Sequence, residues 1–334
     1  MKFTLVSTVF NEEKRLRETI EDLKNQTVKP DEIIITDAGS KDKTVEILNA
    51  AKEFLPIKVI IEKGCNVSRG RNIAIQNAEN DLIVSTDFGC RFKKNWTESL
   101  VKHFENSDCE AVAGAFGVKI DDIQTCAAKA DYIIQNGYPT ANGDEFSGSS
   151  RSIAYKKSVW EKIGGYHEWL TLAADDTVFW RELKAKGIKY EIESEVCVFW
   201  NRHKTAKQFA KEAGRYGLGD GETRINFKNF LSLTAETVMR YLLLPVIIVF
   251  CFLDFEIQKF VWPILIFMLF GLRSYIRVIK NFIRLKDEKI KITILPMCFY
   301  MIETQRIAYI KNYLRGRFFI SKEKKEEAKK LGVK

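Results

Sequence analysis

Short apolar runs alternate strictly with helical stretches of about 12 residues through residues 1–90, and this pattern narrows the possible folds more than any other feature. Apolar runs at 3–10, 32–37, 58–62 and 82–87 predict strands, and the stretches at 13–25, 43–54 and 66–78 predict helices. Such alternation is typical of an α/β fold in which helices flank a mainly parallel sheet. Ligands of these sheets bind at the carboxyl ends of the strands, so the polar residues that follow each strand are the first candidates for a site.

The following part of the chain adds elements of both kinds. We predict helices at 95–104, 157–163, 175–186 and 205–215, strands at 111–118, 153–155 and 190–200, and a polar Gly/Ser-rich loop at 141–150. The glycine-rich segment 217–221 predicts a turn. Seven cysteines are scattered singly without CxxC or Cys/His ligand spacing, which disfavours a structural zinc site and favours reduced thiols in a cytoplasmic protein.

Polar segments follow three of the strands, namely Asn11-Glu12-Glu13, Asp37-Ala38-Gly39-Ser40 and Asp87-Phe88-Gly89. The segment 37–44 also opens a helix, and its glycine and helix N-terminus suit an anionic or nucleotide ligand. An Asx turn followed by a helix cap accounts for the same residues. The segment is neither a GxxxxGK[ST] loop nor a GxGxxG fingerprint.

Several charged residues fit either phosphate chemistry or ordinary structure. Asp87 is placed to bind Mg²⁺ or Mn²⁺ on a diphosphate, or is a turn aspartate. Arg69 and Arg71 lie at a helix start, where they either clamp a phosphate or are solvated. Asp175 and Asp176 begin a helix, either as a general base or because the helix dipole favours carboxylates there.

The order of these motifs resembles the family 2 nucleotide-sugar glycosyltransferases, which have the GT-A fold. The matching segments, all in family order over about residues 3–220, are Thr8–Glu13, the D-x-G-S-x-D-x-T at 37–44, Ser68–Asn72, Thr86–Gly89 at the D-x-D position, Ser149–Lys162, Gly164-Gly165-Tyr166, Ala174–Thr177 at the E-D pair, and Arg181 with Gly187. The resemblance implies an inverting transfer of sugar from a nucleoside diphosphate, UDP- or GDP-linked, to an acceptor.

The resemblance also implies roles for individual residues. Donor-binding residues would be Phe10, Asn11, Glu12, Asp37, Gly39, Ser40, Arg69, Arg71, Asn72, Thr86 and Asp87. Acceptor-side residues would be Gly148, Ser149, Gly165, Tyr166 and Trp180. Asp176 matches the catalytic base, with Asp175 as the fallback.

Two departures from the family pattern bear on the chemistry. Gly89 replaces the second aspartate of D-x-D, so Asp87 alone gives the Mg²⁺ or Mn²⁺ a carboxylate there, and His203 or water would complete the metal site. The Q-x-x-R-W signature of processive synthases is absent, so we expect one sugar to be added per encounter.

The basic excess of the chain lies at its C-terminal end. The net charge is +9, yet residues 273–334 hold 17 Lys/Arg against 6 Asp/Glu, whereas residues 1–272 hold 36 against 38. Uncharged runs at 241–253, 260–272 and 292–302 precede or interrupt the basic part. They predict a short transmembrane hairpin, interfacial or re-entrant helices, or a soluble helical subdomain. In the first two cases the cations after Leu272 place the chain at the cytoplasmic face of the cell membrane.

We therefore predict a GT-A catalytic domain at 1–225, with a donor-binding half at about 1–118 and an acceptor half at about 119–225. Membrane-associated helices would follow at 226–320, and a solvated charged tail at 321–334. Membrane attachment favours a lipid-linked or glycan acceptor, and basic residues that follow apolar segments disfavour nucleic acid. Two other functions remain open, a non-catalytic nucleotide-sugar sensor, which Gly89 favours, and a nucleotidyltransferase, which Asn11-Glu12-Glu13 after the first strand disfavours. The oligomeric state is not predicted.

Overall fold

The computed structural model describes residues 1–105, 107–138, 146, 148–285 and 290–331. The chain divides into two compact units. The first comprises Met1–Asp122, Pro139–Arg202 and Lys322–Val333, and the second comprises Ile123–Tyr138 and His203–Ser321. The division that we expected at residue 225 therefore falls inside the second unit.

An eight-stranded sheet forms the centre of the first unit, in the order β3-β2-β1-β4-β7-β6-β8-β5. Its strands are β1 (Phe3–Val9), β2 (Glu32–Asp37), β3 (Ile57–Ile61), β4 (Leu82–Ser85), β5 (Arg91–Phe92), β6 (Ala111–Gly117), β7 (Ile153–Lys156) and β8 (Tyr190–Phe199). Strands β3, β2, β1 and β4 pair in parallel, as do β6 and β8. The antiparallel pairs are β4 with β7, β7 with β6, and β8 with β5. The mixed, mainly parallel sheet is confirmed.

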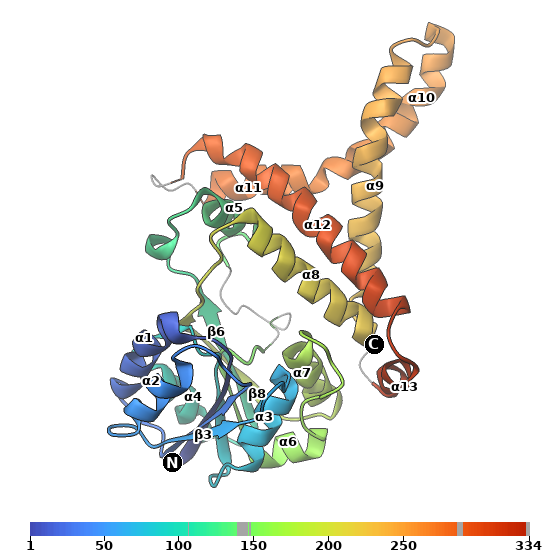
Figure 1. Ribbon diagram of the computed structural model, residues 1–334. Coiled ribbons are helices and arrows are strands. Elements are labelled where there is room, and N and C mark those ends of the chain that lie inside the picture. Colours follow the sequence, from blue (N-terminus) through green and yellow to red (C-terminus); the bar gives the residue numbers. More distant parts are fainter. Residues whose placement is uncertain (106, 139–145, 147, 286–289, 332–334) are drawn as a thin grey trace. The chain divides into compact units, whose positions relative to one another are not determined.

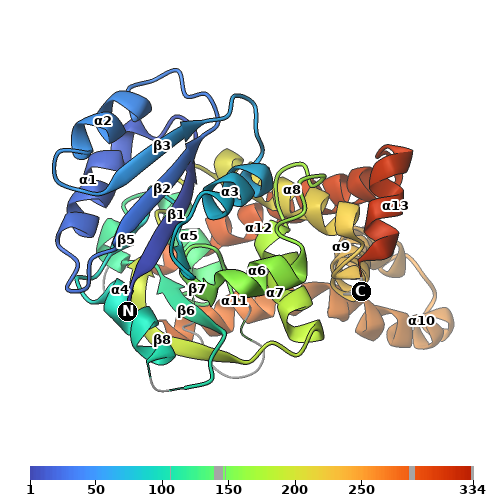
Figure 2. The ribbon, with the colours of Figure 1, turned by 90° about the horizontal axis from the view of Figure 1, so that it is seen from below.

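Helices cover both faces of this sheet (Figure 2). One face packs on α1 (Glu13–Lys24), α2 (Thr44–Ala51) and α4 (Trp96–Val101), and the other on α3 (Val67–Gln76), α6 (Lys157–Ile163) and α7 (Asp175–Ala185). Because strand residues alternate between the faces, Leu5 joins the first core cluster and Val6 the second. Each helix thus buries one apolar stripe, and the loops at the carboxyl ends of β1, β2 and β4 meet at one edge of the sheet.

The second unit is helical (Figure 1). It contains α5 (Cys126–Ile134), α8 (Ala206–Thr223), α9 (Phe227–Phe250), α10 (Phe255–Met268), the 3₁₀ turn Leu269–Leu272, α11 (Arg273–Arg284), the 3₁₀ turn Ile292–Ile294 and α12 (Leu295–Phe318). Helix α13 (Lys322–Lys330) lies in the tail, which we expected to be solvated and irregular. The sequence pattern did not reveal α5 or β5, and the predicted loop at 141–150 lies largely outside the described residues.

The predicted end of a helix at residue 215 is wrong, because α8 continues through the glycine-rich segment to Thr223. Helices α8 and α12 lie side by side (Figure 1). A Cβ atom on Gly217 would lie 2.3 Å from the carbonyl oxygen of Tyr309, and one on Gly221 would lie 2.2 Å from that of Tyr313. The glycines therefore permit backbone contact between two helices rather than form a turn.

Two helical segments, Phe227–Phe250 and Phe255–Arg284, have the length and the apolar composition that a membrane crossing requires. Only 22% and 11% of their most apolar windows are buried. The first segment is α9. Asp254 caps the start of α10 by accepting a hydrogen bond from Glu256 N at 3.1 Å. Helix α10 then returns along α9, so the two helices form a hairpin. These exposed apolar helices agree with the predicted membrane region in position and in character.

Candidate functional site

The loop after β1 interlocks with the loop after β2. Asn11, in a left-handed conformation at φ 56°, donates its backbone N–H to Ser40 Oγ at 2.8 Å and accepts Lys41 N–H on Oδ1 at 2.9 Å. Glu12 N–H donates to Thr44 Oγ1 at 2.8 Å. Two of the sequence motifs thus form one ledge at the carboxyl edge of the parallel strands, where sheets of this class bind ligands.

Asp37 shapes this ledge. Its Oδ2 accepts the backbone N–H groups of Gly39 at 2.8 Å and Ser40 at 2.9 Å, and its side chain is buried. This is the Asx turn that we considered for the segment. Gly39 has φ 92°, a conformation that favours glycine. Asp37 therefore fixes the loop, while its contact with a nucleotide remains a prediction.

Arg71 joins two of the predicted acidic positions. Its side chain is only 5% exposed, and it lies between Asp87, at 2.6 Å, and Asp175. These carboxylates come from the end of β4 and the start of α7. Although burial acts to raise it, the charges of Arg71 and Arg151 lower the pKa of Asp87. The predicted metal position and the predicted base pair therefore lie at the same place.

A second connection runs through Arg151, a residue that the sequence reasoning missed. Its Nε lies 3.9 Å from Asp87 Oδ2, and its Nη1 donates to Ser149 Oγ at 2.9 Å. Ser149 Oγ in turn donates to Asp176 Oδ2 at 3.1 Å. The guanidinium group stacks 3.9 Å from the centre of the Trp200 ring. Arg71 and Arg151 thus make two parallel bridges from Asp87 to the pair Asp175-Asp176.

The pair begins α7 in a strained setting. Ala174 precedes it in a left-handed conformation at φ 73°, which costs a non-glycine residue free energy and turns both carboxylates into the site. Burial raises the pKa of Asp175 to about 6 against the opposing charge of Arg71, and the charges of Asp176 and Asp87 add to the rise. Asp176 Oδ1 accepts the backbone N–H of Thr177 at 2.8 Å.

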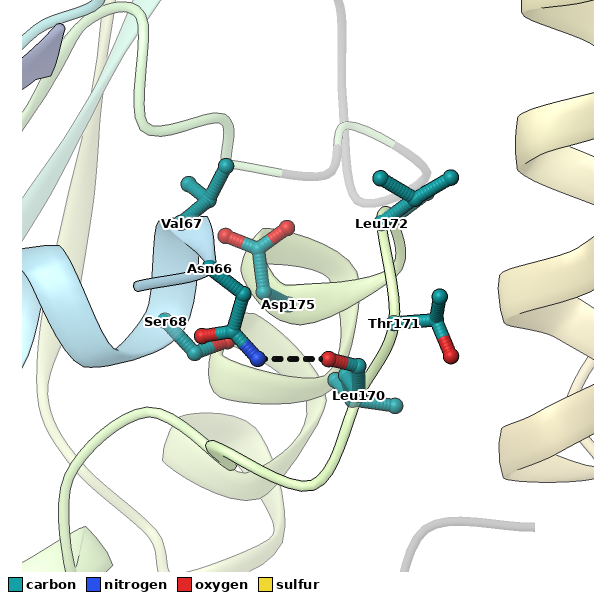
Figure 3. Close-up of a pocket in the computed structure, with 8 residues that line it drawn as sticks. Asn66, Val67, Ser68, Leu170, Thr171, Leu172 and Asp175 are labelled. Carbon is teal, nitrogen blue, oxygen red and sulfur yellow. Dashed lines mark hydrogen bonds between the residues drawn. The ribbon is translucent and has the colours of Figure 1, made fainter. Parts of the chain in front are cut away.

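Asp175 also faces a small pocket (Figure 3). The pocket lies between the first turn of α3 and the segment that precedes α7, and its lining residues are Asn66, Val67, Ser68, Leu170, Thr171, Leu172, Ala173 and Asp175. Asn66 Nδ2 donates to the carbonyl oxygen of Leu170 at 2.7 Å and so holds its two walls together. A carboxylate in a recess of this kind can meet a small polar ligand.

Glu12 fills the space beside Gly89. A Cβ atom on Gly89 would lie 3.2 Å from Glu12 Oε2, and Gly89 has φ 94°. Burial, together with the charges of Asp42 and Asp87, raises the pKa of Glu12 to about 7. The Glu12 carboxylate, from the loop after β1, thus lies close to where an acidic side chain at position 89 would begin.

Other predicted donor residues have partners within the protein. Arg69 is half-exposed and pairs with Glu62 at 2.7 Å and Glu168 at 3.3 Å. Asn72 donates to the carbonyl oxygen of Tyr166 and accepts its N–H, both at 2.8 Å, and so holds the turn at 164–166. Thr86 is buried, and its Oγ1 donates to the carbonyl oxygen of residue 151 at 2.8 Å. Phe10 is 55% exposed at the rim.

The predicted acceptor residues lie mostly beneath the surface. Tyr166 and Trp180 are 3% and 1% exposed and belong to the core cluster of α3, α6 and α7. Gly148 lies against the Trp180 ring, where a Cβ atom would approach a ring carbon to 2.7 Å. Gly165, at φ 81°, faces the Asn72 amide. These residues shape the wall behind Ser149 and Asp176 rather than present a surface of their own.

His203 belongs to the second unit. Its Nε2 lies 3.6 Å from Glu212 Oε1, and its ring meets the edge of Phe209. In the part of the chain that the structure describes, no three His, Cys, Asp or Glu side chains are arranged to hold a metal ion by themselves. Any cation at Asp87 would therefore need oxygen ligands from a bound phosphate or from water.

Residues 4–164 match the family described as Glycosyl transferase family 2. The chain carries a family 2 glycosyltransferase domain. The matched residues hold every predicted donor position, whereas α7, with Asp175 and Asp176, lies just beyond them.

Two similar proteins of the same kind are glycosyltransferases by name. The chain is 26% identical over 219 residues to the O-antigen chain rhamnosyltransferase RfbN of Salmonella typhimurium, covering 62% of this chain and 69% of that protein. It is 24% identical over 206 residues to the poly(ribitol-phosphate) β-N-acetylglucosaminyltransferase TarP of Staphylococcus aureus, covering 58% and 61%. The protein is a glycosyltransferase.

A solved structure shares the architecture of this glycosyltransferase. It is the mannosyltransferase PcManGT from Pyrobaculum calidifontis, in complex with GDP-Man and Mn²⁺, which matches with a TM-score of 0.58 at 13% identity over 96% of this chain and 88% of that one. At this identity the likeness establishes the fold, which is GT-A as predicted, and leaves the ligands of this chain to be inferred from its own residues.

Proposed function

We propose that the protein transfers one sugar from a UDP- or GDP-linked donor to an acceptor held at a membrane, with inversion at the anomeric carbon. The observation that carries the proposal is the double bridge from Asp87 through Arg71 and Arg151 to Asp175 and Asp176. Inverting transfer requires a base on one side of the sugar and charge neutralisation of the diphosphate on the other. The bridge holds groups suited to both tasks in one rigid frame.

Asp176 is the better base of the pair. Asp175 is engaged by the buried Arg71, which ties it to the frame. Asp176 accepts only neutral donors, Ser149 Oγ and the N–H of Thr177, so its charge is not neutralised by a direct ion pair with Arg71. A carboxylate in this state can take the proton of an acceptor hydroxyl as that oxygen attacks the anomeric carbon. Ser149 orients Asp176, and Asp175 orients Arg71.

A divalent cation fits the donor side. Mg²⁺ and Mn²⁺ favour oxygen ligands, and Mg²⁺ is commonly held by one or two carboxylates plus substrate phosphates. Asp87 and Glu12 would hold the cation, Glu12 standing where the family has its second aspartate. When bound, the cation would neutralise charge on the leaving diphosphate. The Mn²⁺ bound in PcManGT supports the use of a divalent cation, and Asp87 and Glu12 can hold it without His203.

The membrane part of the proposal rests on α9 and α10. Glu236 and Arg240 interrupt the apolar sequence of α9, but they are 3% and 6% exposed and pair at 3.0 Å, while Arg240 also meets Glu303 at 2.8 Å. Every exposed residue of α9 from Leu231 to Cys251 is uncharged. The hairpin closes at Arg240, whose Nη1 donates to the carbonyl oxygen of Gly271 at 2.7 Å. At about 1.5 Å per residue the part of α9 beyond Arg240 is about 15 Å long, which is about half of the hydrocarbon core of a bilayer. We propose that this hairpin enters the cell membrane from its cytoplasmic face, with the catalytic unit in the cytoplasm.

The acceptor would then be lipid-linked or attached to a membrane glycan. RfbN is named as an O-antigen chain rhamnosyltransferase and TarP as a poly(ribitol-phosphate) β-N-acetylglucosaminyltransferase, and these two names support a glycan or polymer acceptor. Among the described residues, Asp176 is a half-buried carboxylate, which an acceptor presented from a membrane could approach.

The test is transfer by the full chain purified in detergent. Radiolabelled UDP- and GDP-sugars are supplied with Mn²⁺ and either a polyprenyl phosphate or a soluble sugar. Labelled lipid that depends on Mn²⁺ supports the proposal. Equal labelling of soluble sugars argues against a membrane acceptor, and donor binding without hydrolysis or transfer by any combination favours a sensor. Asp176→Asn abolishes transfer with donor affinity kept, whereas the exposed Asp108→Asn leaves both unchanged.

A further inference from the structure

We propose that α11 is a docking surface for anionic phospholipid headgroups. The inference rests on the membrane association proposed above and adds the chemistry of the lipid. The helix follows directly from the membrane hairpin, since α10 leads through the turn 269–272 into Arg273. Figure 1 shows α11 running crosswise to α9 within the same helical unit. A helix that leaves the base of a membrane hairpin crosswise lies along the surface of the bilayer.

Helix α11 exposes a stripe of isoleucines and buries two polar side chains. Ile276, Ile279 and Ile283 are 48%, 40% and 65% exposed, and their spacing of three and four residues places them on one stripe. The buried side holds Ser274, Val278 and Asn281. In a helix surrounded by water, a stripe of isoleucines would face the protein interior instead.

Specific hydrogen bonds fix this orientation. Ser274 N–H donates to Glu236 Oε1 at 2.8 Å, and Asn281 Nδ2 donates to the carbonyl oxygen of Ile133 at 2.9 Å. Glu236 belongs to α9 and Ile133 to α5, so both ends of the buried face are tied to other helices of the unit. The isoleucines therefore cannot turn inward without breaking buried polar contacts.

A basic stripe runs beside the isoleucines. Arg273, Arg277, Lys280 and Arg284 follow at intervals of four, three and four residues, and residues 273–284 contain no Asp or Glu. Arg273 lies 3.5 Å from Glu236 Oε2, and Arg284 donates to a backbone carbonyl. For Arg277 and Lys280, no ion pair or hydrogen bond is formed with any residue that the structure describes. Two unpaired cations beside an apolar stripe are complementary to a surface of acyl chains and phosphates.

This charge distribution favours a membrane over a second copy of the chain. In a two-fold pair of α11 helices the basic stripes would face one another at the edge of the contact, where like charges repel. An anionic leaflet supplies negative charge and an apolar layer together. An anionic leaflet is therefore the partner of this surface.

The test measures where residue 279 lies in reconstituted full-length protein. A spin label is attached to Ile279→Cys in a background in which the accessible cysteines 65, 126 and 251 are replaced by serine. Vesicles contain phosphatidylcholine alone or with phosphatidylglycerol. We expect the label to become accessible to oxygen and shielded from a water-soluble nickel chelate when phosphatidylglycerol is present. A label at Glu161→Cys, on the exposed side of α6, stays in water in both vesicles.

Charge reversal separates the two parts of the surface. Arg277→Glu with Lys280→Glu returns residue 279 to water, since each cation near an anionic surface contributes about a fivefold preference. The matched variant Lys207→Glu with Lys211→Glu, on the exposed side of α8, leaves the label shielded. A label exposed in both vesicles overturns the proposal, and so does equal shielding in both or spin–spin broadening that shows a second copy. The readout needs neither donor nor acceptor, so it is independent of whether the protein transfers sugar.

Discussion

Glu12 Oε2 lies 3.2 Å from the position that a Cβ atom on Gly89 would occupy. The side chain reaches this point from the loop after β1, whereas Gly89 follows β4. A second aspartate at position 89 would therefore crowd Glu12 and would need a backbone at φ 94°, which L residues rarely adopt. Glycine at 89 and glutamate at 12 form a compatible pair.

Replacing Glu12 by glutamine tests whether it holds the cation. The substitution keeps the size of the side chain and removes one carboxylate, so we expect the affinity for Mn²⁺ in the presence of UDP or GDP to fall about tenfold or more. Titration calorimetry or Mn²⁺ electron paramagnetic resonance measures this without turnover. Glu46→Gln, on the exposed side of α2, is the control. Unchanged Mn²⁺ affinity in Glu12→Gln would remove Glu12 from the metal site.

Arg71→Lys breaks the first bridge. A lysine ammonium cannot bond both Asp87 and Asp175 as the planar guanidinium does. Lysine therefore leaves one of the two carboxylates without its partner, which costs up to about 3–5 kcal/mol for a buried group such as Asp175, so we expect a marked loss of thermal stability together with loss of transfer. Arg69→Lys is the matched control two residues away, because its ion pairs are exposed to water and add little to stability. Similar melting temperatures for both variants would contradict the bridge.

The pH dependence of stability tests whether the pKa of Asp175 is raised. Burial raises its pKa to about 6, so its contribution to stability is present below about pH 4 and is lost as the pH rises through about 6. The free energy of unfolding of the parent protein should therefore fall between about pH 4 and pH 6 relative to Asp175→Asn. Chemical denaturation at several pH values measures the difference. The same pH slope in both proteins would contradict a raised pKa.

The strands and the loops of the donor side follow from sequence because both are local. Apolar runs mark β1 to β4, and in a parallel sheet their carboxyl ends meet at one edge, which brings Asn11, Asp37 and Asp87 together without further information. Their arrangement in one ledge is what the structure adds.

The contacts of Arg151 could not be predicted in the same way. It lies just before β7, which enters the sheet antiparallel to β4, so its approach to Asp87 depends on a strand pairing distant in sequence. Sequence also cannot tell that Tyr166 and Trp180 face inward, because aromatic residues serve cores and binding surfaces alike. Gly217 and Gly221 resemble a turn in the sequence, because the α12 backbone that they contact lies about 90 residues further along the chain.

Alanine at Gly217 or Gly221 tests the contact between α8 and α12. Either Cβ atom would lie within 2.3 Å of a backbone carbonyl oxygen of α12, and a backbone cannot move aside as a side chain can. We expect each variant to lose about 1–3 kcal/mol of stability through overpacking, which exceeds the gain of about 0.5–1 kcal/mol from alanine in a helix. Gly214→Ala is the matched control, because its Cβ atom would meet the end of the Asn312 side chain at 2.9 Å, while the nearest backbone atom, Ala308 O, lies at an ordinary contact distance of 3.6 Å. Thermal unfolding of the three variants in detergent should show Gly214→Ala near the parent protein, and a stable Gly217→Ala would mean that the two helices are further apart than described here.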